Sequence, residues 1–113
     1  MSEPVTHLDI EPKLNLEKRH LNIVQQILQS RLPDEQVWAF GSRTTSTAKP
    51  YSDLDLAIIN SRPTALELLA SLSEDFSNSD LPFRVDVVDW ATTSEAFRSI
   101  IQKHKVVIQT PRA

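Results

Sequence analysis

The stretch that decides the fold is Trp38-Ala39-Phe40-Gly41-Ser42-Arg43, which ten further residues separate from Asp53-Leu54-Asp55. Residues 36–40 are short, apolar and aromatic, a pattern that predicts a β-strand. Gly41 is the only glycine of the chain. A glycine directly after a strand favours a tight backbone turn, because glycine adopts a positive φ without steric cost. The Ser- and Thr-rich residues that follow predict a loop that begins with one helical turn.

Asp53 and Asp55 open a second predicted strand, residues 54–59. Because side chains alternate along a strand, the two carboxylates share one face while the leucines between and after them take the other. Two carboxylates so close repel each other, and each is costly to bury unpaired. A divalent cation resolves both problems, and Mg²⁺ takes hard oxygen ligands together with substrate phosphates. Taken alone, an Asp-x-Asp pair is more often an ordinary turn ending before a strand than a metal site.

The predicted metal site includes a third carboxylate from a later strand. Asp86 lies in Arg84-Val85-Asp86-Val87-Val88, within a predicted strand over residues 83–88 that the flanking valines favour as central in the sheet. Such an acid on an adjacent strand would complete a two-metal site. Asp89 is the competitor, but by strand parity it faces away from Asp86 and sits where a turn begins. We therefore favour Asp86.

The remaining elements predict helices around these strands. Asn15 is expected to cap a helix that reaches Arg31, and capping-box patterns at Thr64–Glu67 and Thr92–Glu95 open two more helices. Residues 106–109 predict a short edge strand. The order of elements indicates an α/β (α+β) fold, in which helices pack on a small mixed β-sheet. The order of strands within the sheet does not follow from the sequence.

Composition sets limits on function. The 113 residues suit one domain, expected over 14–113 after a loose arm of residues 1–13. A net charge of −3 argues against general nucleic-acid binding, and the lack of cysteine excludes disulfides and Cys-based zinc sites. No signal peptide or membrane-spanning run is present in the sequence, and we expect a cytoplasmic protein with no membrane partner.

The combination of a strand, Gly-Ser, ten residues, Asp-x-Asp and a later Asp resembles the minimal nucleotidyltransferases (MNT) of the polymerase-beta superfamily. Their signature is a hydrophobic residue followed by Gly-Ser, about ten residues, Asp-x-Asp, and then an Asp between hydrophobic residues on a later strand. Phe40-Gly41-Ser42, Asp53-Leu54-Asp55 and Val85-Asp86-Val87 supply these parts. The resemblance extends over residues 37–89 and implies the nucleotidyltransferase fold.

The resemblance also implies roles. Asp53 and Asp55 would hold one or two Mg²⁺ ions that grip a nucleoside triphosphate, ATP or another. Asp86 would bind the catalytic metal and help to activate the attacking hydroxyl. Gly41-Ser42 would contact the β- and γ-phosphates through a turn whose amides face the anion. Arg43 either approaches a phosphate or is a solvated surface arginine.

The reaction implied is transfer of a nucleoside monophosphate, AMP from ATP in studied members, to an acceptor hydroxyl. The resemblance further implies a hetero-oligomer with a small all-helical partner of the HEPN type or the nucleotidyltransferase substrate-binding type, with this chain as antitoxin in the toxin–antitoxin version. Two alternatives stay open: a non-catalytic antitoxin or scaffold that neutralises its partner by binding, and a regulatory module that binds NTP without turnover. The sequence reveals neither the base preference nor the acceptor.

Overall fold

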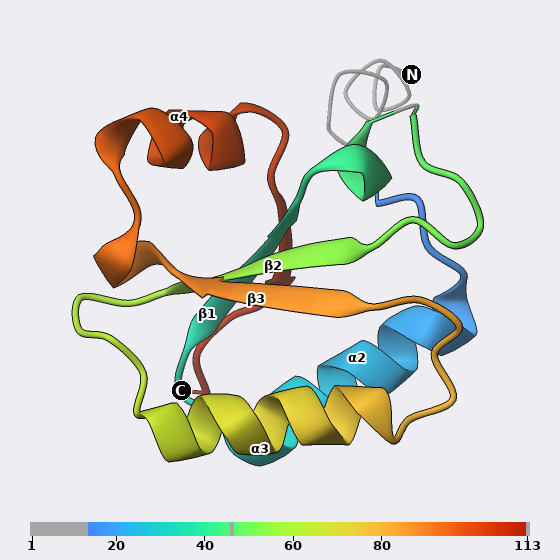
Figure 1. Cartoon of the computed structure of the whole chain (residues 1–113), viewed down its shortest axis with the longest axis horizontal. Helices are drawn as coiled ribbons and strands as arrows, with labels where there is room; N and C mark the ends of the chain where they lie inside the picture. Colours follow the sequence, from blue (N-terminus) through green and yellow to red (C-terminus); the bar gives the residue numbers. More distant parts are fainter. Residues whose placement is uncertain (1–13, 46, 113) are drawn as a thin grey trace, which may run out of the picture.

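The computed structural model describes residues 14–45 and 47–112, so the arm expected over residues 1–13 lies outside the described residues. Three helices and two short 3-10 turns surround one four-stranded mixed sheet, as the element order predicted (Figure 1). In chain order the elements are α2 (Lys18–Arg31), β1 (Gln36–Phe40), η1 (Ser42–Thr44), β2 (Leu54–Ile59), α3 (Leu66–Ser77), β3 (Val85–Asp89), η2 (Trp90–Thr92), α4 (Glu95–Lys103) and β4 (Val106–Gln109).

The strands lie in the order β3-β2-β1-β4. β1 is antiparallel to both β2 and β4, whereas β2 and β3 are parallel. β3 was expected at the centre of the sheet, and that expectation is wrong, because β3 is an edge strand. The reason is topological: β1 already occupies one side of β2. The crossover through α3 therefore sets the parallel strand β3 on the other side, where no further strand of the described chain follows.

The two faces of the sheet are covered unequally (Figure 1). Helices α2 and α3 lie side by side against one face, and a bidentate ion pair joins Arg31 to Asp75 between them, with a shortest distance of 2.6 Å. Among the α-helices of the described residues, α4 alone packs on the other face, where it covers, together with Trp90 of η2, an aromatic cluster around Trp38 and Phe40. The core under α2 and α3 comprises chiefly Val24, Leu28, Val37, Leu54, Leu56, Ile58, Leu72 and Phe76.

The expected helix caps need correction at three places. Asn15 does not cap α2, since its backbone N–H donates to the Arg43 carbonyl and α2 begins after Glu17 without a side-chain cap. Thr64 does not cap α3, which begins after Ala65 without a side-chain cap; the Thr64 hydroxyl instead accepts from Asn60 Nδ2 at 3.2 Å and donates to Asp89 Oδ1 at 2.7 Å. The last helix does have a side-chain cap, but it is Ser94, whose Oγ accepts from the Phe97 amide at 3.1 Å.

In residues 14–45 and 47–112, none of the helices combines the length and the hydropathy that a membrane span requires.

Candidate active site

The sheet register brings the predicted acids together. Asp55 on β2 pairs with Asp86 on the parallel neighbour β3 and with Phe40 on the antiparallel neighbour β1. Neighbouring strands lie about 4.8 Å apart, so the two carboxylates project from adjacent backbones on the same face. Asp53 precedes β2 by one residue and shares that face by parity. The three acids lie on the α4 face of the sheet, at the end where the chain enters β2; Ala57 and Ile59, further along the same face of β2, pack in the cluster under α4.

Gly41 lies directly beneath one of these acids. Its φ of 85° and ψ of −157° fall in a region that is essentially restricted to glycine. A Cβ atom at this position would lie 3.3 Å from the Asp55 Cγ and still closer to its Oδ2. Glycine is therefore required here twice, once by backbone conformation and once by the close approach of the Asp55 carboxylate. Ser42, half-buried, follows as the first residue of η1.

The electrostatics of the cluster reflect this convergence. Burial, together with the negative charges of Asp86 and then Asp53, raises the pKa of Asp55 to about 6. Arg84 offsets part of this charge, because its guanidinium donates to Asp86 Oδ1 at 2.9 Å. Asp86, and more weakly Asp53, raise the pKa of Arg84 in turn. The exposed Arg84 is a member of the site that the sequence analysis missed, although its i, i+2 spacing from Asp86 places it on the same face.

The donor set suits a hard divalent cation, since three carboxylates from two adjoining strands supply the oxygen ligands that Mg²⁺ prefers. Within residues 14–45 and 47–112, no group of three or more His, Cys, Asp or Glu side chains is arranged so that it could hold a metal ion. The Arg84 ion pair engages one oxygen of Asp86. A cation at this site would share Asp86 with Arg84, because the carboxylate has a second oxygen that the ion pair does not use.

The structure corrects one of the two roles expected for Arg43, and its contact with a phosphate stays a prediction. Its side chain is buried, with 5% exposure, so it is not a solvated surface arginine. Its donors are directed at backbone carbonyls, and the guanidinium carbon also lies 4.2 Å from the centre of the Phe83 ring. The carbonyls are those of Ser52, Asn15 and Pro50, each at 2.9 Å, and of Lys49 at 3.4 Å. Arg43 therefore holds in place the loop that leads to Asp53.

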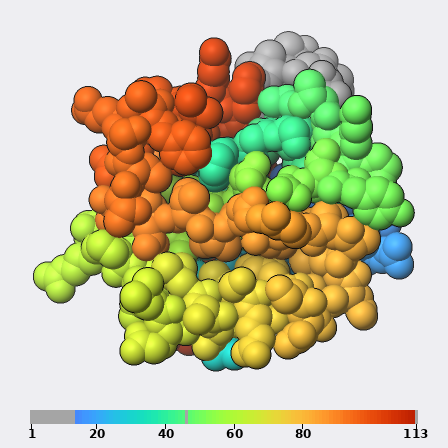
Figure 2. Space-filling model, in the orientation of Figure 1, coloured from blue at the N-terminus to red at the C-terminus, as the bar shows by residue number. Residues whose placement is uncertain are grey.

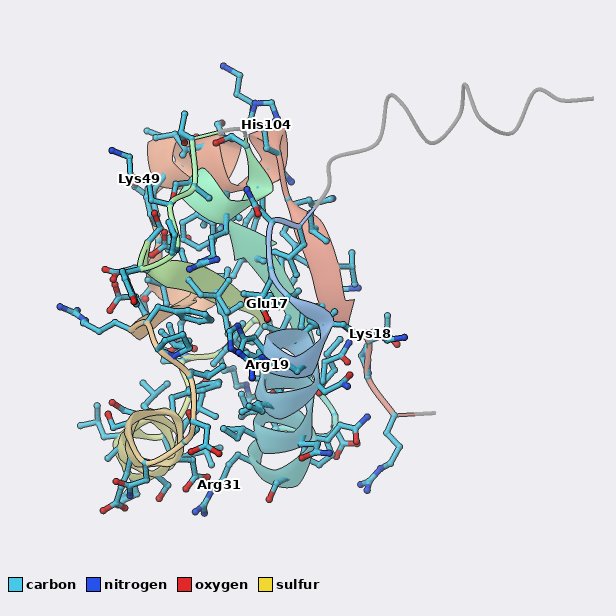
Figure 3. The ribbon with its side chains drawn as sticks, turned by 90° about the vertical axis from the view of Figure 1, so that its right-hand side faces the viewer. Glu17, Lys18, Arg19, Arg31, Lys49 and His104 are labelled. Atoms are coloured by element: carbon cyan, nitrogen blue, oxygen red, sulfur yellow. The ribbon has the colours of Figure 1, made fainter. Side chains whose placement is uncertain are left out.

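Within this loop, residues 49–52 form a tight turn, and two hydrogen bonds join its first residue, Lys49, to its last, Ser52. The Ser52 amide donates to the Lys49 carbonyl at 3.0 Å, and the Lys49 amide donates to Ser52 Oγ at 2.8 Å. The Lys49 side chain extends outward from this turn (Figure 3). Because the partners of Arg43 are backbone atoms, the sequence carries no side-chain pattern that would have identified this role.

Replacing Arg43 by methionine should lower the free energy of unfolding by about 2–3 kcal/mol, because the buried carbonyls lose charged hydrogen-bond donors. The measurement is the urea midpoint of wild type and variant. Arg62→Met, a change at an exposed arginine, should alter stability by less than about 0.5 kcal/mol. An unchanged midpoint for Arg43→Met together with weaker NTP binding would instead support the phosphate-contacting role.

Asp89, the competitor of Asp86, has a structural role. Its side chain is buried, with 8% exposure. Its carboxylate accepts from Asn60 Nδ2 at 2.9 Å, the Thr64 amide at 3.0 Å and the Thr64 hydroxyl at 2.7 Å. These bonds fix the loop between β2 and α3. Asp89 therefore lies at the opposite end of β3 from the acid cluster, with its oxygens already satisfied.

A mixed sheet that brings a glycine–serine turn and three aspartates to one end of one face defines a nucleotidyltransferase-fold domain. Residues 22–112 match the model of the polymerase beta nucleotidyltransferase family, and the chain belongs to that family. It is accordingly a nucleotidyltransferase.

A curated relative and several solved structures are similar to this chain. The probable protein adenylyltransferase MntA of Haemophilus influenzae is 57% identical over 97 residues, which cover 86% of this chain and 85% of the relative. A chain from a toxin–antitoxin complex with AMP-PNP superposes with a TM-score of 0.68 at 20% identity, covering 81% of this chain and 74% of that one.

A second structural match comes from a complex of a tri-AMPylated Shewanella oneidensis HEPN toxin with an MNT antitoxin. Its TM-score is 0.65 at 20% identity, over 84% of this chain and 73% of that chain. At this level of identity, the structural matches establish the fold alone.

Proposed function

We propose that this chain transfers AMP from ATP to a hydroxyl group of a separate HEPN-type protein and thereby acts as the antitoxin of a toxin–antitoxin pair in the cytoplasm. The observation that carries the proposal is the register of Asp55 with Asp86 beside Gly41. The 57% identity to a probable protein adenylyltransferase supports adenylyl transfer to a protein. The matched complex of a tri-AMPylated HEPN toxin with an MNT antitoxin supports the kind of partner.

Each residue of the site has a separate role in the proposed reaction. Asp53, Asp55 and Asp86 would hold Mg²⁺, which supplies charge neutralisation at the phosphates when bound. The turn at Gly41-Ser42 receives the β- and γ-phosphates. The acceptor oxygen forms a bond to the α-phosphorus, the bond from that phosphorus to the bridging oxygen breaks, and pyrophosphate leaves. The acceptor hydroxyl loses its proton to a carboxylate on its side of the site; the position of Asp86 on β3 supports Asp86 in this role.

The test mixes the chain, a HEPN-type candidate partner, Mg²⁺ and ATP labelled at the α-phosphate. We expect the label to appear on the partner with wild type and to be absent with Asp53→Asn/Asp55→Asn, because two of the three proposed cation ligands are then neutral. Labelling is read by gel autoradiography and by the mass of the modified partner.

Two results would contradict the proposal. Unlabelled partner in the wild-type reaction would exclude this acceptor. Equal labelling by the double variant would exclude the acids as the active site. If the double variant still neutralises the partner at equal expression, neutralisation is by binding, as in the scaffold alternative.

A further inference from the structure

An open groove runs between the outer edge of β3 and helix α3. One hollow of about 600 Å³ reaches from Tyr51 and Asp53 to Asp86, and a second of about 280 Å³ continues between Leu69 and Val87. Both hollows are lined by Ser73, Val85 and Asp86, so they form one channel, here called the β3–α3 groove. Figure 2 shows β3 (orange) and α3 (yellow) exposed next to each other on this face of the molecule.

The strand that forms one wall of the groove is open along its outer side. β3 pairs only with β2 within the described chain, and Val85, Asp86, Val87 and Val88 are all partly exposed. An edge strand presents a row of backbone N–H and C=O groups that an extended segment of another chain can pair with. The opposite wall carries small polar side chains on α3, such as Ser73, which leave room for such a segment.

The geometry of in-line transfer indicates which reactant lies in the groove. The parts of the site follow one another across the sheet. The turn at Gly41 lies at the end of β1, Asp55 lies next to it on β2, Asp86 follows on β3, and the groove lies beyond β3. In-line transfer requires the attacking hydroxyl and the leaving pyrophosphate to lie on opposite sides of the transferred phosphorus. If the phosphates lie at Gly41, the hydroxyl must approach from the side of β3. The groove is the hollow on that side.

We propose that the β3–α3 groove binds an extended segment of the protein acceptor, which pairs with β3 as a fifth strand and presents its hydroxyl side chain next to Asp86. The proposal rests on the proposed function for the existence of a protein acceptor, and it adds where and in what conformation that acceptor binds. The larger hollow is floored by Phe76 and Phe83 and edged by polar groups, which suits a bulky side chain with a hydroxyl end.

Hydrogen exchange tests the pairing. In the complex of the full chain with the HEPN-type partner, amides of Val85–Val88 should exchange more slowly than in the free chain. Amides of Val106–Gln109 on the other edge strand, β4, serve as the internal control and should not change. Bound partner without protection of β3 would overturn the proposal, as would equal protection of both edges.

A substitution in the wall of the groove supplies the second test. Ser73→Arg should raise the KM for the HEPN-type partner at least about tenfold, because the long side chain fills the channel, while binding of AMP-PNP with Mg²⁺ stays unchanged. Ala70→Arg, which makes the same charge change at an exposed α3 position outside the groove, should leave both quantities unchanged.

The outcomes are separable. Normal transfer to the partner by Ser73→Arg would overturn the groove assignment. A loss of AMP-PNP binding in that variant would also overturn it, because the groove would then be the binding site of the nucleoside. Absence of transfer in wild type would instead overturn the proposed function. In that case the exchange experiment still decides whether the partner pairs with β3.

Discussion

Asp55→Asn should abolish AMP transfer and at the same time stabilise the folded protein. The loss of activity is expected to be on the order of 10³-fold, because the side chain stands between Gly41 and Asp86 and its negative charge is central to the proposed cation site. Stabilisation follows because the ionised Asp55 is disfavoured by burial and by two neighbouring carboxylates, and asparagine has nearly the same shape without the charge.

The raised pKa of Asp55 determines how the stability of the folded protein changes with pH. The folded-state pKa of Asp55, about 6, lies above its ordinary value of 3.8, which applies in the unfolded chain. The folded state therefore binds the proton more tightly, and its stability falls as pH rises from about 4 to above 6. Above that window, Asp55→Asn should be more stable than wild type by about 1 kcal/mol, after allowance for solvent screening at a half-exposed site.

Thermal unfolding at pH 4 and pH 7.5 measures this effect. The two proteins should unfold at similar temperatures at pH 4, whereas at pH 7.5 the variant should unfold several degrees higher, roughly 4–8 °C. Added Mg²⁺ and AMP-PNP should raise the wild-type midpoint and leave the variant's midpoint unchanged. The control is Asp80→Asn at an exposed aspartate, which should change neither activity nor stability. A variant less stable than wild type at pH 7.5 would contradict the convergence of charges.

Such a gain in stability on loss of function is expected where a site gathers like charges for catalysis. Arg84 moderates that cost in the free protein by pairing with Asp86. The pair is exposed on the Arg84 side, with 77% of that side chain accessible, so it contributes little to folding. Its effect is local, because it places a positive charge beside the Asp86 carboxylate.

The strands and the acid face could be predicted because they depend on local alternation. β1, β2 and β4 have the expected bounds, and the buried leucines of β2 place Asp55 on the opposite face, as parity required. The placement of β3 at the edge could not be predicted, because its valines are packed against α3 on one face and look the same in an edge or a central strand. Strand order depends on the crossover, which no local pattern encodes.

The expectations for Thr64 and for a solvated Arg43 failed for the same physical reason. Thr64 has the sequence of a capping box, but its hydroxyl donates to Asp89, 25 positions away, and accepts from Asn60. Arg43 is a similar case, because its partners are carbonyls distributed over residues 15–52. Local patterns predict local bonds, and both side chains here are used for contacts between distant parts of the chain.

Gly41→Val should weaken the binding of AMP-PNP with Mg²⁺ at least about tenfold and destabilise the fold. Valine at a φ of 85° and a ψ of −157° carries a strain of about 1–3 kcal/mol, and its Cβ would collide with the Asp55 carboxylate. The backbone of the turn and the carboxylate must then move apart, which separates the two parts of the site that face the phosphates. Calorimetric titration measures the affinity, and chemical denaturation measures the stability.

A double-mutant cycle separates backbone strain from the collision with Asp55. Gly41→Ala is compared in the wild-type and the Asp55→Ala backgrounds, since the second background removes the carboxylate that a Cβ would meet. The strain is common to both, so the loss of stability should be smaller by about 1 kcal/mol in the Asp55→Ala background. Equal losses would mean that Gly41 is needed only for its backbone conformation. If Gly41→Val also bound AMP-PNP as wild type does, the turn would be a hinge of the sheet and not the phosphate-facing part of the site.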